Sequence, residues 1–127
     1  FITSKLWNYL YHQDNVIPAL KDSLQKLQLG YLDLYLIHWP VAFKAGVPMP
    51  ESASDFVPLS EVPISETWNK MEEAKEKGLV KHIGVSNFSV KKLSNLIEKA
   101  RVAPEVNQVE LHPLLQQKEL LQFCIKN

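Results

Sequence analysis

The sequence has little of several features that often define a function. Its 127 residues include a single cysteine, Cys124, so an internal disulfide or a cysteine metal cluster cannot form. The apolar helical pattern around Cys124 predicts a buried thiol, as expected in a reducing cytoplasm. The only glycines, Gly30, Gly46, Gly78 and Gly84, match neither the G-x-G-x-x-G dinucleotide fingerprint nor the P-loop spacing. An ordinary Rossmann domain is therefore disfavoured.

An excess of charge of either sign is also missing. Fourteen basic residues balance fourteen acidic ones, which gives a nucleic acid or an anionic membrane no electrostatic basis for binding. We therefore expect a small-molecule partner and a cytoplasmic location. No apolar run approaches the roughly 20 residues that span a bilayer, and the N-terminus lacks the pattern of a signal peptide.

The apolar content is sufficient for one compact domain over residues 1–127, since 46% of the residues are hydrophobic. The sequence has no initiator Met, begins inside an expected strand and ends inside an expected helix. We therefore expect a partial domain, truncated at both ends.

Four short runs rich in β-branched, aromatic or leucine residues predict strands, at residues 1–6, 32–37, 82–85 and 106–111. A helical pattern follows each run. Strands that alternate with helices are typical of a parallel sheet, because antiparallel neighbours would not need a helix between them. The sequence therefore predicts an α/β fold.

Capping residues mark the ends of the expected helices. Gly30 is predicted to end the first helix, Ser65 and Gly78 to bound the second, and Ser89 to begin the third. The fourth helix is predicted from its apolar residues Leu120, Leu121, Phe123 and Cys124. Between the second strand and its helix, residues 41–63 form a long proline-containing stretch, and a loop of that length is usually functional.

Polar or catalytically capable side chains stand where each predicted strand ends. They are Lys5 and Trp7, His38 and Trp39, Ser86 and Asn87, and then Gln108, Glu110 and His112. In parallel α/β folds, ligands bind at the carboxyl ends of the strands, where the following loops and helix N-termini converge. The residues at all four strand ends therefore predict a ligand-binding site at one edge of the sheet.

Several motifs at these ends resemble, in order, signatures of the aldo-keto reductase family. They are SKLW at residues 4–7, LGYLDLYLIHWP at 29–40, GLVK at 78–81, IGVSNF at 83–88 and VNQVE at 106–110. The resemblance covers essentially the whole chain. It implies a (β/α)8 TIM barrel, present here as a partial barrel of about four βα units that match strands three to six. It also implies NADPH-dependent reduction of aldehydes and ketones.

The resemblance implies roles for individual residues at these strand ends. Lys5 would be the catalytic lysine that lowers the pKa of a proton-donating tyrosine from about 10, because a nearby cation favours the phenolate. His38 would orient the substrate carbonyl. The substrate pocket would be lined by Trp7 and Trp39. The nicotinamide carboxamide of NADPH would be held by Ser86, Asn87 and Gln108.

Part of the family's catalytic set has no match in this sequence. The family's tyrosine, and the aspartate that pairs with the lysine, belong before the third strand, and none of Tyr9, Tyr11, Tyr31 or Tyr35 fits the tyrosine motif. We therefore expect the 127-residue chain alone to be inactive and prone to self-association, and the intact protein to be a monomer.

Two other functions remain open at the level of sequence. A non-catalytic protein that binds NADPH on the same fold would keep the nicotinamide contacts. A metal-dependent hydrolase on a similar barrel could use His38, Glu110 and His112, but no H-E-x-x-H or H-x-H spacing supports it. We predict no metal site.

Overall fold

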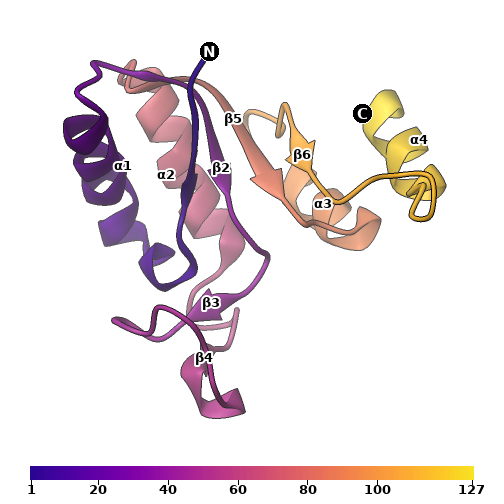
Figure 1. The fold of residues 1–127 in the computed structure, drawn as a ribbon, viewed down its shortest axis with the longest axis horizontal. Helices are drawn as coiled ribbons and strands as arrows, with labels where there is room; N and C mark the ends of the chain where they lie inside the picture. The colour runs from indigo at the N-terminus through magenta and orange to yellow at the C-terminus, as the bar shows by residue number, and fades with distance from the viewer.

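Four parallel strands form the main sheet of the computed structural model, which describes residues 1–127 (Figure 1). Their order across the sheet is β1 (Thr3–Leu6), β2 (Leu32–Ile37), β5 (Val80–Ser86) and β6 (Asn107–Gln108). Every neighbouring pair is parallel, and a helix lies between consecutive strands of this sheet. The predicted α/β class is confirmed, with the sheet curled into a half-barrel.

The four helices are α1 (Gln13–Leu27), α2 (Ile64–Glu76), α3 (Val90–Ile97) and α4 (Lys118–Lys126). Figure 1 shows α1 and α2 packed together beside β1 and β2, with α3 next to β5 and β6 and α4 beyond β6. No helix of this structure combines the length and apolar character that crossing a bilayer demands.

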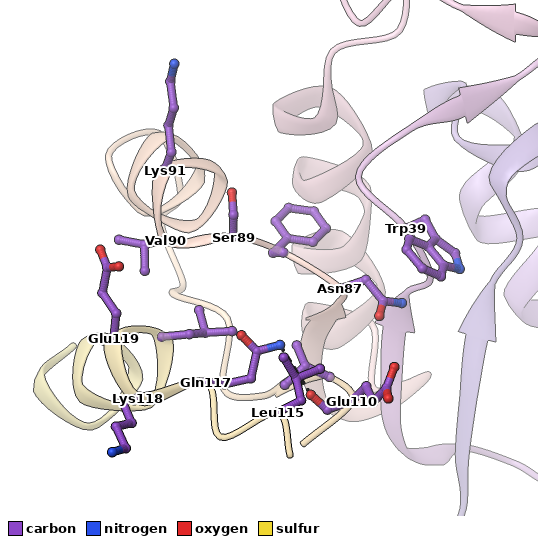
Figure 2. A pocket seen from close by; sticks show the side chains of 13 residues that line it. Trp39, Asn87, Ser89, Val90, Lys91, Glu110, Leu115, Gln117, Lys118 and Glu119 are labelled. Carbon is purple, nitrogen blue, oxygen red and sulfur yellow. Dashed lines mark hydrogen bonds between the residues drawn. The ribbon is translucent and has the colours of Figure 1, made fainter. Parts of the chain in front are cut away.

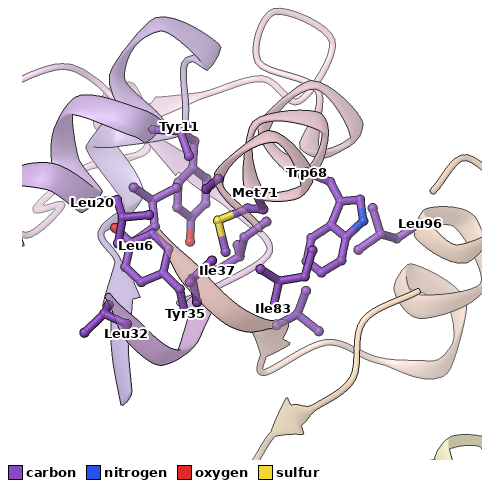
Figure 3. Close-up of a cluster of buried hydrophobic side chains, with 14 of the residues drawn as sticks. Leu6, Tyr11, Leu20, Leu32, Tyr35, Ile37, Trp68, Met71, Ile83 and Leu96 are labelled. Atoms are coloured by element: carbon purple, nitrogen blue, oxygen red, sulfur yellow. The ribbon is translucent and has the colours of Figure 1, made fainter. Parts of the chain in front are cut away.

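A continuous apolar core lies between the sheet and the helices (Figure 3). It forms because strand residues that face α1 and α2 alternate with residues of the opposite face, whereas the helices turn one apolar stripe inward. Its largest fully buried side chains include Trp68, Tyr11, Tyr35, Leu6, Leu20 and Met71. Each fully buried leucine or methionine contributes about 1.5–3 kcal/mol relative to an exposed one.

The helix ends agree with the sequence at two of four predicted positions. The side chain of Ser89 accepts a hydrogen bond from Lys92 N and caps α3, and Gly78 has a positive φ of 71° after α2. Two predictions were wrong. The left-handed residue after α1 is Gln28 (φ 56°) and not Gly30, and α2 begins before Ser65, with Pro63 at its N-cap.

The predicted strands were found, with different bounds. β5 starts two residues earlier than predicted, at Val80, because the exposed and charged Lys81 interrupts the apolar run after Val80. β6 ends at Gln108 rather than Leu111, since its pairing with β5 stops at Ser86. Cys124 is exposed, so the buried thiol predicted for it was wrong: no residue of α4 is buried in this structure.

The long stretch at residues 41–63 contains a small hairpin and one turn of helix. Its strands are β3 (Ala42–Phe43) and β4 (Phe56–Val57), which pair antiparallel, and η2 (Ala53–Asp55) precedes β4. The rings of Phe43 and Phe56 meet edge to face, with centroids 5.4 Å apart. A second short helix, η1 (Asn8–Leu10), follows β1 and lies near β3.

Candidate active site

The carboxyl ends of the four strands lie in register and bring the predicted site residues to one edge of the sheet. Lys5 pairs with Leu36 across β1 and β2, and Ile37 pairs with Val85 across β2 and β5. Gln108 then pairs with Ser86. The residues that follow these strands therefore lie at the same end of the half-barrel.

His38 lies directly after β2 in a partly enclosed position. Its ring meets that of Trp7 edge-on, with centroids 4.8 Å apart, and its Nδ1 atom is buried without a hydrogen-bond partner. Burial lowers the pKa of His38 below its ordinary value of about 6.5, and the charge of Lys5 lowers it further. The imidazole is therefore neutral at pH 7.

A neutral imidazole has one N–H donor and one bare acceptor nitrogen. Because an unpaired buried N–H is rarer in proteins than an unpaired buried acceptor, the orphaned Nδ1 of His38 favours the tautomer with its proton on Nε2. His38 can then donate a hydrogen bond from Nε2 without carrying a charge. Lys5, partly buried on β1, makes no salt bridge, so its charge is left free to act on the site.

The two tryptophans differ in how they are held. The indole Nε1 of Trp7 donates a 3.0 Å hydrogen bond to the carbonyl oxygen of Pro48, which ties β1 to the 41–63 stretch. The side chain of Trp39 is 46% exposed, and its backbone N–H and C=O are both bonded to the hydroxyl of Tyr11. The indole ring of Trp39 is thus a partly exposed apolar surface, and two hydrogen bonds hold the backbone that carries it.

Ser86, Asn87 and Gln108 form a connected group at the ends of β5 and β6. The Ser86 hydroxyl and the Asn87 backbone N–H both donate to the Gln108 carbonyl oxygen, at 2.8 and 2.9 Å. Asn87 has a positive φ of 63°, which turns its side chain back towards β2. Its Nδ2 donates to the carbonyl of His38 and to Ser86 Oγ, each at 3.1 Å.

These contacts leave specific groups free for a ligand. Both hydrogens of the Asn87 amide are engaged, so its Oδ1 remains as an acceptor. The side chain of Gln108 is exposed and makes no hydrogen bond within the chain. Beside Asn87 and Trp39, a cavity of about 650 Å³ opens between the N-terminal ends of α3 and α4 (Figure 2).

Glu110 lines the same cavity as Asn87 and Trp39, and His112 pairs with it (Figure 2). His112 Nε2 is 2.8 Å from Glu110 Oε1, and the side chains of His112 and Glu110 are 43% and 73% exposed. The fold does not bring His38 into a metal-binding cluster with them, and no three His, Cys, Asp or Glu side chains are grouped in that way.

The structure adds three residues that sequence reasoning missed. Tyr11, Asn8 and Lys92 each hydrogen-bond the backbone that follows His38. None of them stands at a strand end, and none belongs to one of the motifs. Only the arrangement of η1 and α3 around that backbone identifies them.

The chain is similar to known proteins along essentially its whole length. The model of the Aldo/keto reductase family matches residues 1–127. An aldo/keto reductase of Synechocystis sp. is 54% identical over 124 residues, which are 98% of this chain and 38% of that protein. Deoxymugineic acid synthase 1-D of Triticum aestivum is 51% identical over 125 residues, with 98% and 39% covered.

Solved structures of similar proteins share the fold. The aldose reductase of Giardia lamblia superposes with a TM-score of 0.91 at 42% identity, over 100% of this chain and 42% of its own. A Bombyx mori aldo-keto reductase in complex with NADP gives 0.86 at 39% identity, over 99% and 38%. These neighbours are TIM barrels, which confirms the predicted partial barrel. The chain spans about two fifths of the length of the relatives it matches.

Proposed function

The chain belongs to the aldo/keto reductase family, and on that premise we propose that the protein carrying it reduces aldehydes and ketones to alcohols with NADPH. The observation that supports this most directly is the placement of Lys5 and of a neutral, partly enclosed His38 at the ends of adjacent strands. Carbonyl reduction needs a donor directed at the carbonyl oxygen and a cation that favours proton release from a nearby acid.

His38 supplies the first requirement. A neutral imidazole with its proton on Nε2 can donate a hydrogen bond to a carbonyl oxygen and so fix the substrate's orientation. Lys5 supplies the second, because its positive charge lowers the pKa of a neighbouring phenol that donates the proton. The phenol is the tyrosine that family resemblance implies, and it lies outside these 127 residues.

The free groups beside β5 and β6 fit a nicotinamide carboxamide. This group has two N–H donors and one carbonyl acceptor, and Asn87 Oδ1 and the Gln108 side chain offer complementary partners. Ser86 holds Asn87 in place through its hydroxyl. NADPH, when bound, supplies the hydride. The protein's part is to hold the ring so that one of its faces is turned to the substrate.

We propose apolar carbonyl compounds as substrates. The site is walled by Trp7 and Trp39, and the tie between Trp7 and Pro48 keeps the 41–63 stretch beside them. Such walls favour aldehydes and ketones with apolar substituents over polyhydroxylated sugars, because burial of hydroxyl groups without partners is costly.

The test uses the full-length protein that carries this chain. We expect it to consume NADPH, followed by absorbance, when an aromatic aldehyde is added. Lys5→Met should lower kcat by about 100-fold or more, since proton transfer is worth about 10²–10⁴-fold. Lys21→Met is the matched control, because Lys21 is exposed on α1, and it should leave kcat unchanged. An unmodified protein that binds NADPH but does not oxidise it with any carbonyl compound would refute the proposal.

A further inference from the structure

Four consecutive backbone carbonyls, those of residues 38–41, each accept a hydrogen bond from a side chain. The donors come from three separate parts of the fold: the end of β5, the η1 region and α3. They are Asn87 Nδ2 to His38 O at 3.1 Å, Tyr11 Oη to Trp39 O at 2.7 Å, Lys92 Nζ to Pro40 O at 2.9 Å and Asn8 Nδ2 to Val41 O at 2.6 Å. We call residues 38–41 the pinned turn.

The pinned turn needs these donors because the sheet ends just before it. The last ladder bond of β2 runs from His38 N to Leu6 O at 3.3 Å. Beyond it no strand supplies partners, and buried backbone groups without partners are unfavourable. Tyr11 replaces the missing strand at Trp39, since its hydroxyl accepts from Trp39 N at 2.8 Å and donates to Trp39 O.

Tyr11 is itself held firmly. Its side chain is 1% exposed, and the hydroxyl of Thr67 on α2 donates a 2.7 Å hydrogen bond to its backbone carbonyl. Burial raises the pKa of Tyr11 far above its ordinary value of 10, so its hydroxyl keeps its proton. A protonated phenol can donate and accept at once, as the two bonds to Trp39 require.

We propose that Tyr11 is a positioning residue for the active site, which sets the placement of His38 and Trp39 through the backbone of the pinned turn. The inference rests on the proposed function. The Tyr11 hydroxyl bonds Trp39 and makes no hydrogen bond to Ser86, Asn87 or Gln108, so we expect its effect to fall on substrate orientation. A displacement of about 1 Å of a positioned group can cost about 100-fold in rate.

The test compares two buried tyrosines in the full-length protein. Tyr35 is as buried as Tyr11 and lies three residues before His38 on β2, but its hydroxyl bonds Ser23 on α1 and not the pinned turn. Tyr11→Phe should lower kcat for an aldehyde by about 10–100-fold and leave KM for NADPH within about twofold. Tyr35→Phe should leave both constants within about twofold.

A second readout does not depend on turnover. The His38 imidazole can be titrated by NMR in each variant. Tyr11→Phe removes no charge, so a rise of the His38 pKa towards its ordinary value would report that the ring has become more solvated. Tyr35→Phe should leave that titration unchanged. If the unmodified protein has no reductase activity, the proposed function fails, whereas this titration still tests the positioning role.

A milder variant keeps the test open should Tyr11→Phe not fold. Thr67→Val keeps the shape of the side chain and removes only its bond to Tyr11 O, and it should shift the His38 titration in the same direction by less. Equal losses of kcat in Tyr11→Phe and Tyr35→Phe, with an unchanged His38 titration, would overturn the proposal. So would an unchanged kcat in a folded Tyr11→Phe protein.

Discussion

Gly84 of β5 passes so close to Val106 that a Cβ atom on Gly84 would lie 2.6 Å from the carbonyl oxygen of Val106. That oxygen accepts a 2.8 Å hydrogen bond from Val85 N, so it cannot move without loss of the bond that joins the chain before β6 to β5. Leu36 of β2 closes the same space, with its Cδ2 atom 2.8 Å from the Cβ position. The absence of a side chain at Gly84 thus allows the sheet to curl tightly here.

Gly84→Ala should therefore destabilise the protein. Overpacking of a filled core typically costs about 1–3 kcal/mol, and the nearest atom here is backbone, which yields less readily than a side-chain end. Denaturant unfolding of the full-length protein would measure the change. Gly30→Ala is the matched control, because nothing lies within 4 Å of its added Cβ and its φ is not positive. Equal stability of the two variants would contradict the close-approach argument.

Glu72 of α2 should be essential for holding the segment that joins α3 to β6 against α2. Its carboxylate is 1% exposed. Oε1 accepts from the backbone N–H groups of Arg101 and Val102 at 2.8 and 2.9 Å, and Oε2 accepts from Arg101 Nε at 2.9 Å. Glu72→Ala leaves buried donors unpaired, each at about 1–3 kcal/mol, whereas Glu72→Gln can keep the two backbone bonds and should lose less.

The free energies of unfolding of three variants test this order. Glu76→Gln is the control, because Glu76 also pairs with Arg101, at 2.9 Å, but is 61% exposed. An exposed ion pair contributes about 0–1 kcal/mol. The expected order of destabilisation is Glu72→Ala, then Glu72→Gln, then Glu76→Gln, and any other order would count against the docking role of Glu72.

Glu73 should contribute a pH-dependent term to stability. Hydrogen bonds from Lys70 and Lys77 lower the pKa of Glu73 from 4.5 to about 2. A carboxylate with a lowered folded-state pKa stabilises the fold above its unfolded pKa, and this stabilisation is lost as the pH falls through the folded value. Stability should therefore decline between about pH 5 and pH 2, and Glu73→Gln should make that decline shallower. An identical acid profile for the variant would show that the two ion pairs do not hold in solution.

The sequence predicts the strand–helix order and the placement of the site because both depend on local patterns. Short apolar runs followed by amphipathic stretches are sufficient to predict parallel strands, and parallel strands direct their ends to one edge. Lys5, His38 and Ser86 were identified for this reason, and the fold brings their strand ends together. Their roles in catalysis and binding stay predictions.

What the sequence could not predict depends on contacts between distant segments. Gln28 takes the left-handed conformation expected of Gly30 because the packing of α1 decides where that helix stops, and a propensity is only a weak guide. Tyr11 lies 28 residues from Trp39 in the chain, and no periodicity relates the two. The pinned turn could be recognised only after η1 and α3 had been placed around it.

Transfer of deuterium tests the central claim most directly. The full-length protein would be given NADPH labelled with deuterium at the transferring position of the nicotinamide ring, together with an apolar aldehyde, and the alcohol would be analysed by mass spectrometry. We predict an alcohol with one deuterium on the former carbonyl carbon, formed much more slowly by the Lys5→Met protein. If NADPH binds and no deuterated alcohol forms, the site holds the cofactor without catalysing reduction, and the proposed function is wrong.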